Sequence, residues 1–192
     1  MAFECLPSEF SAPVVWFDTE QLGEANEKVR NDGKDIWNEA EIRTVISILY
    51  RLAGEENLTQ SLARTGEPQI GVICMYSEQK RRIVREWSQQ PLPDAFKDLV
   101  TIDTVDAYQG KENAIVILSL VRANGSKITG HVGSANRCNV ALSRAKERLF
   151  VVGNAAMWSD PRCNSPMRTV WNEIRGLNTD EGKVLDAREL RS

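Results

Sequence analysis

The polar segment TVDAYQGKEN, residues 104–113, carries side chains suited to a charged ligand. An amide, an ammonium and a carboxylate cluster at Gln109, Lys111 and Glu112. Gly110 lies among them, and a residue without a Cβ lets the backbone approach a ligand closely. The same composition is typical of a solvated turn, because charged turns that contain glycine are common. Taken alone, this segment leaves both interpretations open.

A second segment, NRCNVALSRAKERL at residues 136–149, brings two arginines close together in the sequence. Its pattern predicts a helix from about Ser134 to Lys146, which would place Arg137 and Arg144 two turns apart on one side. The guanidinium fork matches phosphate oxygens, and an arginine at a γ-phosphate neutralises charge that develops during phosphoryl transfer. The alternative is an amphipathic helix with ordinary surface arginines.

A third segment, CMYSEQKRR at residues 74–82, places polar side chains at the turn from a strand to a helix. Ser77 is a candidate cap for that helix, and Tyr76 and Gln79 lie beside it. Backbone amides at a helix start, with Lys80 and two arginines nearby, suit a phosphate of a nucleic-acid backbone. A solvated helix face is the alternative.

The elements that must position these segments are predicted by apolar patterning. Strands such as AIVILSL and LFVV are apolar at consecutive positions, as burial on both faces of a parallel sheet requires. The expected strands are 14–17, 70–74, 99–103, 114–120 and 148–152. The sequence therefore predicts an α/β fold with a mainly parallel sheet covered by helices, and ligands at the carboxyl ends of its strands.

The remaining segments complete this expectation. A helix from Asn38 ends at Gly54, which we expect to be a left-handed cap. We expect a long surface loop or insertion over residues 19–37 and a polar connector over 55–69. A helix covers SPMRTVWNEIRGL, and the charged tail that follows, 178–192, is expected to be partly disordered.

Composition limits the possible functions. The chain has 192 residues, 42% of them hydrophobic and 27% charged, which predicts one globular domain. A formal charge of -3 and a pI near 5.4 mean that any nucleic-acid contact must come from local groups. The single histidine, His131, rules out a histidine-rich metal site and gives a Ser-His-Asp triad little support.

Sequence signals also bear on location and on other enzyme classes. The cysteines are scattered without a CxxC pair, which favours a reducing, cytosolic setting. The N-terminus lacks the pattern of a signal peptide, and no apolar stretch approaches the roughly 20 residues that span a bilayer. We therefore expect neither secretion nor membrane insertion. No GxGxxG turn follows the first strand, which argues against a dinucleotide enzyme.

In this order, the three segments resemble the second RecA-like domain of superfamily-one helicases of the nonsense-mediated-decay regulator type. IGVICMYSEQ looks like motif IV, TVDAYQGKENAIVILSLVRAN like motif V, and NVALSRAKERLFVVGN like motif VI. The resemblance is strong over residues 70–154 and looser over 13–54. It implies a RecA-like three-layer domain over 1–160, with a C-terminal helix and charged tail over 161–192.

The resemblance also implies roles for individual residues. Arg144 matches the arginine finger, and Arg137 matches an earlier arginine of motif VI that either assists or only braces the loop. The residues expected at the nucleotide are Gln109, Gly110, Glu112 and Arg137. Those expected beside the nucleic-acid track are Tyr76, Thr104 and Asp106. Ala114 departs from the family pattern, which usually has an acidic residue there, and no residue is assigned to a metal.

The sequence contains no GxxxxGK[ST] loop. By resemblance, ATP and Mg²⁺ are held mainly by a first RecA-like domain of the same protein, and the isolated chain is expected to be inactive. We expect part of an ATP-dependent helicase that acts on single-stranded DNA or RNA, moves 5′ to 3′, and is cytoplasmic, or nuclear in a eukaryote. The alternative is a non-catalytic nucleic-acid-binding or protein-interaction module derived from a helicase half.

Overall fold

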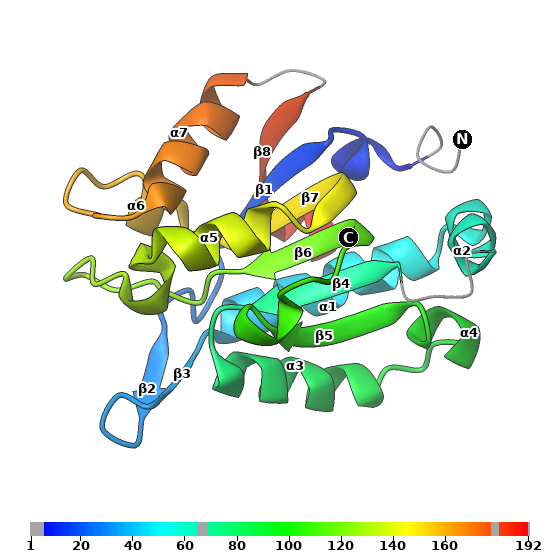
Figure 1. Cartoon of the computed structure of the whole chain (residues 1–192), viewed down its shortest axis with the longest axis horizontal. Helices are drawn as coiled ribbons and strands as arrows, with labels where there is room; N and C mark the ends of the chain where they lie inside the picture. The colour runs from blue at the N-terminus through cyan, green and yellow to red at the C-terminus, as the bar shows by residue number, and fades with distance from the viewer. Residues whose placement is uncertain (1–5, 65–68, 178–180, 192) are drawn as a thin grey trace.

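The computed structural model of the chain describes residues 6–64, 69–177 and 181–191 (Figure 1). Its centre is a six-stranded sheet in which all neighbouring strands run parallel. In spatial order the strands are β5 (Val100–Thr104), β4 (Ile70–Cys74), β6 (Asn113–Ser119), β7 (Ala145–Gly153), β1 (Val14–Asp18) and β8 (Gly182–Asp186). Every residue of β4 and β6 is buried, which explains their nearly continuous apolar sequences.

Helices lie on both sides of this sheet (Figure 1). One side carries α1 (Glu39–Ala53), α2 (Glu56–Ala63), α3 (Ser77–Ser88) and α4 (Asp94–Lys97). The other side carries α5 (Ala135–Leu142), α6 (Ala155–Trp158) and α7 (Pro166–Leu177). Short 3-10 helices are η1 (Ser8–Phe10), η2 (Asp106–Tyr108), η3 (Gly130–Gly133) and η4 (Ala187–Arg191). The predicted three-layer α/β fold is confirmed.

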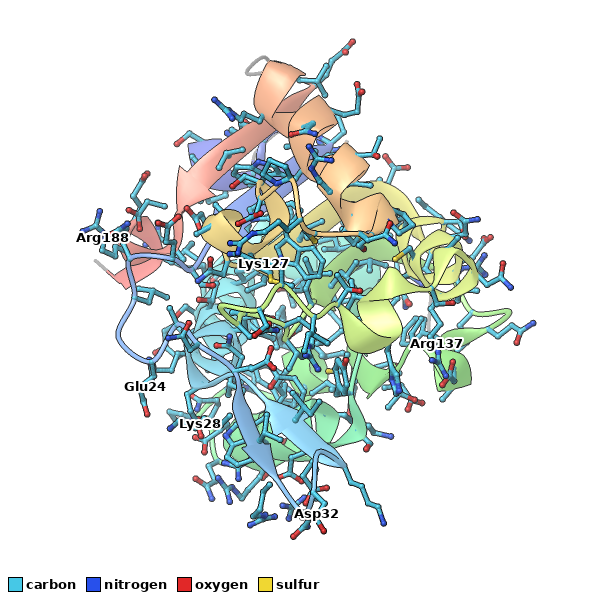
Figure 2. All side chains as sticks on the ribbon, turned by 90° about the vertical axis from the view of Figure 1, so that its left-hand side faces the viewer. Glu24, Lys28, Asp32, Lys127, Arg137 and Arg188 are labelled. Carbon is cyan, nitrogen blue, oxygen red and sulfur yellow. The ribbon has the colours of Figure 1, made fainter. Side chains whose placement is uncertain are left out.

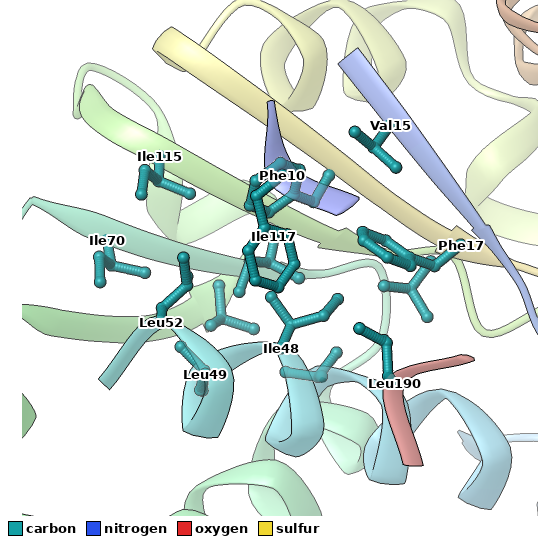
Figure 3. Close-up of a cluster of buried hydrophobic side chains, with 14 of the residues drawn as sticks. Phe10, Val15, Phe17, Ile48, Leu49, Leu52, Ile70, Ile115, Ile117 and Leu190 are labelled. Atoms are coloured by element: carbon teal, nitrogen blue, oxygen red, sulfur yellow. The ribbon is translucent and has the colours of Figure 1, made fainter. Parts of the chain in front are cut away.

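The core consists of two hydrophobic clusters, one on each face of the sheet. Successive strand residues point to opposite faces, so Ile115 and Ile117 of β6 join one cluster, whereas Val116 and Leu118 join the other. Figure 3 shows the first cluster, where Ile48 of α1 lies among the strand side chains. Burial on both faces fixes the position of each strand, and hence of the loops that leave it.

The expected loop over residues 19–37 contains an antiparallel hairpin. Its strands are β2 (Lys28–Arg30) and β3 (Asp35–Trp37), and it projects from the body of the domain (Figure 1). Asn31, Asp32 and Gly33 at its tip have φ values of 53°, 52° and 86°. Asn, Asp and Gly are the residues that adopt this left-handed conformation most readily, so the turn is encoded locally.

Two other expectations about the elements are wrong, and a third, that of a partly disordered tail, is tested only over residues 181–191, which are folded. The connector over 55–69 contains α2, whose Leu58 and Leu62 are buried. Gly54 has φ -71°, so it ends α1 in a right-handed conformation and not as a left-handed cap. The tail expected to be partly disordered includes β8, which pairs with β1 at the edge of the sheet. Residues 178–180 and 192 of that tail lie outside the described residues.

Candidate nucleotide and nucleic-acid site

The motif V segment crosses one face of the sheet. β5 and β6 both pair in parallel with β4, which lies between them. The chain leaves β5 at Thr104, at the carboxyl ends of the strands, and must return to the amino ends of the strands to begin β6. Residues 105–112 must therefore span the face on which α5 lies. Tyr108 of this strap is buried, and its hydroxyl donates a hydrogen bond of 2.8 Å to Asn113 Oδ1. Burial raises the pKa of Tyr108 well above its usual range, so the hydroxyl remains a donor.

This anchor turns other side chains of the strap outward. Gln109 and Gly110 are exposed, as is Glu112. Gly110 has φ +84°, a conformation that favours glycine, and it reverses the strap toward β6. Lys146 Nζ lies 3.5 Å from Glu112 Oε2, so the strap and the start of β7 meet at this corner. The side chains that the sequence assigned to a ligand are thus accessible on one face.

The motif VI helix is shorter than predicted. α5 ends at Leu142 and β7 begins at Ala145, so Arg144 lies in the turn between them and not two helical turns after Arg137. The helix ends because the chain begins to pair with β6: the Asn113 amide donates a hydrogen bond to Arg144 O at 3.0 Å. Arg144 O thus accepts a hydrogen bond from the neighbouring strand and not from a later residue of a helix.

The Arg144 guanidinium folds back on its own turn. Its Nε donates to Val140 O at 3.0 Å, Nη1 to Lys111 O at 3.2 Å, and Nη2 to Ser143 Oγ at 2.7 Å. One of these acceptors belongs to the motif V strap and two belong to motif VI. Arg144 therefore joins the two motifs at the corner where Glu112 also lies.

A trough runs along the exposed side of α5. One part is a cavity of about 440 Å³, whose walls include Asp106, Gln109, Asn136, Arg137, Asn139 and Val140. A second hollow, of about 520 Å³, is lined by Asn139, Val140, Leu142, Ser143 and Arg144. The two parts share Asn139 and Val140, so they lie next to each other between the two arginines, and together they are called the trough. Both arginines, and the Gln109 amide, can reach a ligand that lies in it.

Arg137 closes one end of this trough through an ion pair with Asp106. Nε and Nη2 donate to the two carboxylate oxygens at 2.9 and 3.0 Å, and Arg137 faces outward in Figure 2. The hydrogen bonds from Arg137 hold the pKa of Asp106 below its usual value. Arg137 therefore contacts the motif V strap in this structure, and both roles given for it stay predictions.

Tyr76 is not an exposed track residue. Its side chain is 7% exposed, and its ring stacks on His131 with an interplanar angle of 3° and a centroid distance of 4.8 Å. His131 is exposed, so the histidine that the sequence analysis set aside is the member of the stack that meets solvent. Thr104 ends β5 half-buried at the same edge.

Gln79 is likewise unavailable to a ligand. It is fully buried, where Oε1 accepts from the Asn38 amide at 2.9 Å and Nε2 donates to Ser119 Oγ at 2.9 Å. Ser77 does not cap α3 but is its first residue, after Tyr76, and no side chain caps the helix. In this structure, Gln79 and Ser77 of motif IV therefore contribute to packing near the carboxyl end of β4 and not to an open site.

Sequence reasoning missed a buried carboxyl group near the carboxyl ends of β4 and β6. Glu41 on α1 is fully buried, and its oxygens accept from Ser119 Oγ at 2.7 Å and from the Val121 amide at 2.8 and 2.9 Å. Burial raises the pKa of Glu41 to about 8. Val121 has φ +73°, which is strained for a β-branched residue, and Glu41 holds it there.

The described residues contain neither a cluster of metal-binding side chains nor a membrane-spanning helix. Within residues 6–64, 69–177 and 181–191, no group of three His, Cys, Asp or Glu side chains is placed to hold a metal ion. In the same described ranges, no helix has the length and apolar character needed to cross a membrane. Three of the cysteines, Cys74, Cys138 and Cys163, are buried free thiols.

Comparison with known proteins shows the family to which this chain belongs. A family model described as AAA domain matches residues 4–156. The chain is 39% identical over 116 residues to "Helicase required for RNAi-mediated heterochromatin assembly 1" of Schizosaccharomyces pombe, a match that covers 60% of the chain and 11% of that protein. It is 31% identical over 172 residues to "DNA polymerase alpha-associated DNA helicase A" of Saccharomyces cerevisiae, covering 88% and 23%.

A third relative, "ATP-dependent helicase NAM7" of Saccharomyces cerevisiae, is 37% identical over 124 residues, which is 62% of the chain and 12% of that protein. The chain thus spans less than a quarter of each of these three relatives. The matched region contains the strands β1, β4, β5, β6 and β7, the motif V strap and α5, whereas β8 lies beyond it. The chain therefore belongs to the AAA domain family, as a C-terminal RecA-like domain of the superfamily-one helicase type.

Proposed function

We propose that this chain is the C-terminal motor domain of an ATP-dependent helicase or translocase, and that it presents Arg144 to a nucleotide held mainly by a first RecA-like domain. The observation that carries this proposal is the position of Arg144, at the corner where the motif V strap meets the motif VI turn and at one end of an open trough. A guanidinium there can neutralise charge on a γ-phosphate during phosphoryl transfer.

The trough supplies the other nucleotide contacts. Gln109 and Arg137 line its deeper part, Gly110 exposes backbone beside them, and Glu112 lies at the Arg144 corner. The Gln109 amide, the Arg137 guanidinium and the backbone amide are donors that fit phosphate oxygens, whereas the Glu112 carboxylate can only accept, for example from a ribose hydroxyl. The carboxylates of Asp106 and Glu112 already form ion pairs, with Arg137 and Lys146 respectively. Mg²⁺ would therefore be held by residues of the first domain, and it would shield the phosphate charge there. The isolated chain would then have no ATPase activity.

The nucleic-acid track would lie at the carboxyl ends of the strands, where Thr104 ends β5, Asp106 follows it and Tyr76 follows β4. Single-stranded DNA and RNA both suit contacts made through phosphates. Domain closure on ATP and opening after hydrolysis would move the protein along the strand. The cytoplasm, or the nucleus of a eukaryote, is the proposed location.

The test replaces Arg144 in a longer protein that contains both domains. We expect Arg144→Ala to lower ATP turnover by about 10³-fold or more, while nucleotide affinity changes much less. Arg144→Lys keeps the charge but loses the fork, so it should restore only part of the rate. Arg85→Ala, which removes an exposed arginine of α3, is the matched control.

Two results would contradict the proposal. Turnover unchanged in Arg144→Ala would remove Arg144 from the chemistry. ATP hydrolysis at helicase-like rates by the isolated chain would show that the site is not divided between two domains.

A further inference from the structure

The Tyr76 and His131 stack forms a fixed aromatic surface at the edge of the sheet. The two rings are nearly parallel, at 3°, and their centroids are 4.8 Å apart. Tyr76 is buried beneath, while His131 is exposed above it. The tyrosine covers one face of the imidazole, and because His131 is exposed as a residue, we infer that the other face is open to solvent.

Several contacts hold this stack in place. Tyr76 Oη accepts a hydrogen bond from the His131 amide at 3.1 Å and another from Arg122 Nη1 at 3.4 Å. His131 Nδ1 lies 3.4 Å from Met75 O. Gly130 precedes the histidine with φ +54°, and a Cβ at this position would overlap Tyr76 Oη. The ring is thus ordered before any ligand binds, which lowers the entropic cost of binding.

The stack lies where the nucleic-acid track is proposed. Cys74 pairs with Thr104 in the sheet, so Tyr76 and Asp106 each follow by two residues at the same carboxyl edge. Asp106 in turn holds Arg137. The exposed imidazole therefore neighbours one end of the α5 trough.

The negative net charge of the chain favours a nucleic-acid contact that does not depend on charge. The formal net charge is -3, so phosphate attraction over the whole surface is weak. Stacking of a base on an aromatic ring needs no net charge and tolerates any base, because every base has a π-face. An acidic domain can therefore use stacking to bind a strand of any base sequence.

We propose that the His131 ring is a stacking platform for one base of a single-stranded nucleic acid. The proposal rests on the proposed function, since it assumes that this edge carries the strand. His131 acts in it as a flat ring and not as a proton donor, and Tyr76 acts as the support beneath it.

The experiment measures binding of the chain to labelled oligonucleotides by fluorescence anisotropy at fixed low salt, with DNA and with RNA strands. Each strand is compared with an abasic strand of the same length, which keeps the phosphates and lacks bases. We expect His131→Ala to weaken binding of the ordinary strand by about 5- to 100-fold and to leave abasic binding unchanged. His131→Phe, which keeps a ring without the imidazole, should bind the ordinary strand like the wild type.

Other outcomes would overturn the inference. Equal affinity of His131→Ala and wild type for the ordinary strand would remove the platform while leaving the proposed function intact. Equal losses on ordinary and abasic strands, or a loss in His131→Phe as large as in His131→Ala, would show a role other than stacking. A wild-type chain that binds neither strand would overturn the track and the platform together. Thermal unfolding of each variant verifies that it folds.

Discussion

Raising the pH from about 5 to about 8 is expected to weaken the fold through Glu41. Its pKa is raised in the folded chain, to about 8, because it is buried. Below pH 4.5 the carboxyl is protonated in both the folded and the unfolded states, so it has no effect. Between 4.5 and about 8 the unfolded chain releases the proton and the folded chain keeps it. Stability therefore falls as pH rises through this window.

The size of the effect follows from the width of the window. One proton gives a slope of about 1.4 kcal/mol per pH unit, so the free energy of unfolding falls by about 5 kcal/mol across the window. This is comparable with the whole stability of a small domain. The half-buried Asp18 also has its pKa raised by desolvation and acts in the same direction, so a variant is needed to isolate Glu41.

Urea unfolding followed by tryptophan fluorescence at several pH values measures the slope. Glu41→Gln removes the titrating group and keeps its shape, although its amide donors face the Val121 amide and will lower stability at every pH. We expect the variant to lose most of the decline between pH 5 and 8. Glu86→Gln removes an exposed carboxylate of α3 as a matched control. A wild type whose stability is flat or rises over this range, or a Glu41→Gln slope equal to the wild type's, would refute the reasoning.

Two further predictions concern the motif V strap. Gly71→Ala should destabilise the domain by about 1–3 kcal/mol in chemical unfolding, because the new Cβ would overlap Tyr108 Oη and lie 2.7 Å from Asn113 Oδ1. A neutral result would mean that the strap moves without cost. Asp106→Ala and Arg137→Ala, alone and together, should give a coupling energy of at most about 1 kcal/mol that shrinks with salt, because the pair is 64% and 34% exposed. A coupling of several kcal/mol would contradict this.

The central sheet and the long helices were predictable because burial leaves a direct pattern in the sequence. Continuous apolar runs encode β4 and β6, which are covered on both faces. The β2 and β3 hairpin was missed because its strands are short and polar, and Trp37 is packed by the distant Arg82, whose guanidinium carbon lies 3.9 Å from the ring centroid. β8 was missed because its edge position depends on pairing with β1, far away in the chain.

The candidate site was predictable as an order of motifs but not as a set of contacts. Nothing local reveals that α5 ends before Arg144, because the bond that ends it comes from Asn113 on another strand. Tyr76 and Gln79 resemble ligand-binding residues in sequence, yet long-range partners bury both. Glu41 lies on a helix whose pattern suggested only scaffold, and its partners are some eighty residues away. Polar groups that recognise distant backbone leave little trace in a local pattern.

The backbone hydrogen bond from Asn113 to Arg144 affects how fast the Arg144 side chain can reach a nucleotide. Since Arg144 O is held by the sheet, the guanidinium can reach a phosphate only by rotation about its own side-chain bonds. Side-chain rotations take picoseconds to nanoseconds, whereas domain closures take microseconds to milliseconds. Under the proposed function, the arginine would follow each closure with negligible delay. With Arg144 present, the turnover rate would then be limited by the approach of the two domains and not by the rotation of this side chain.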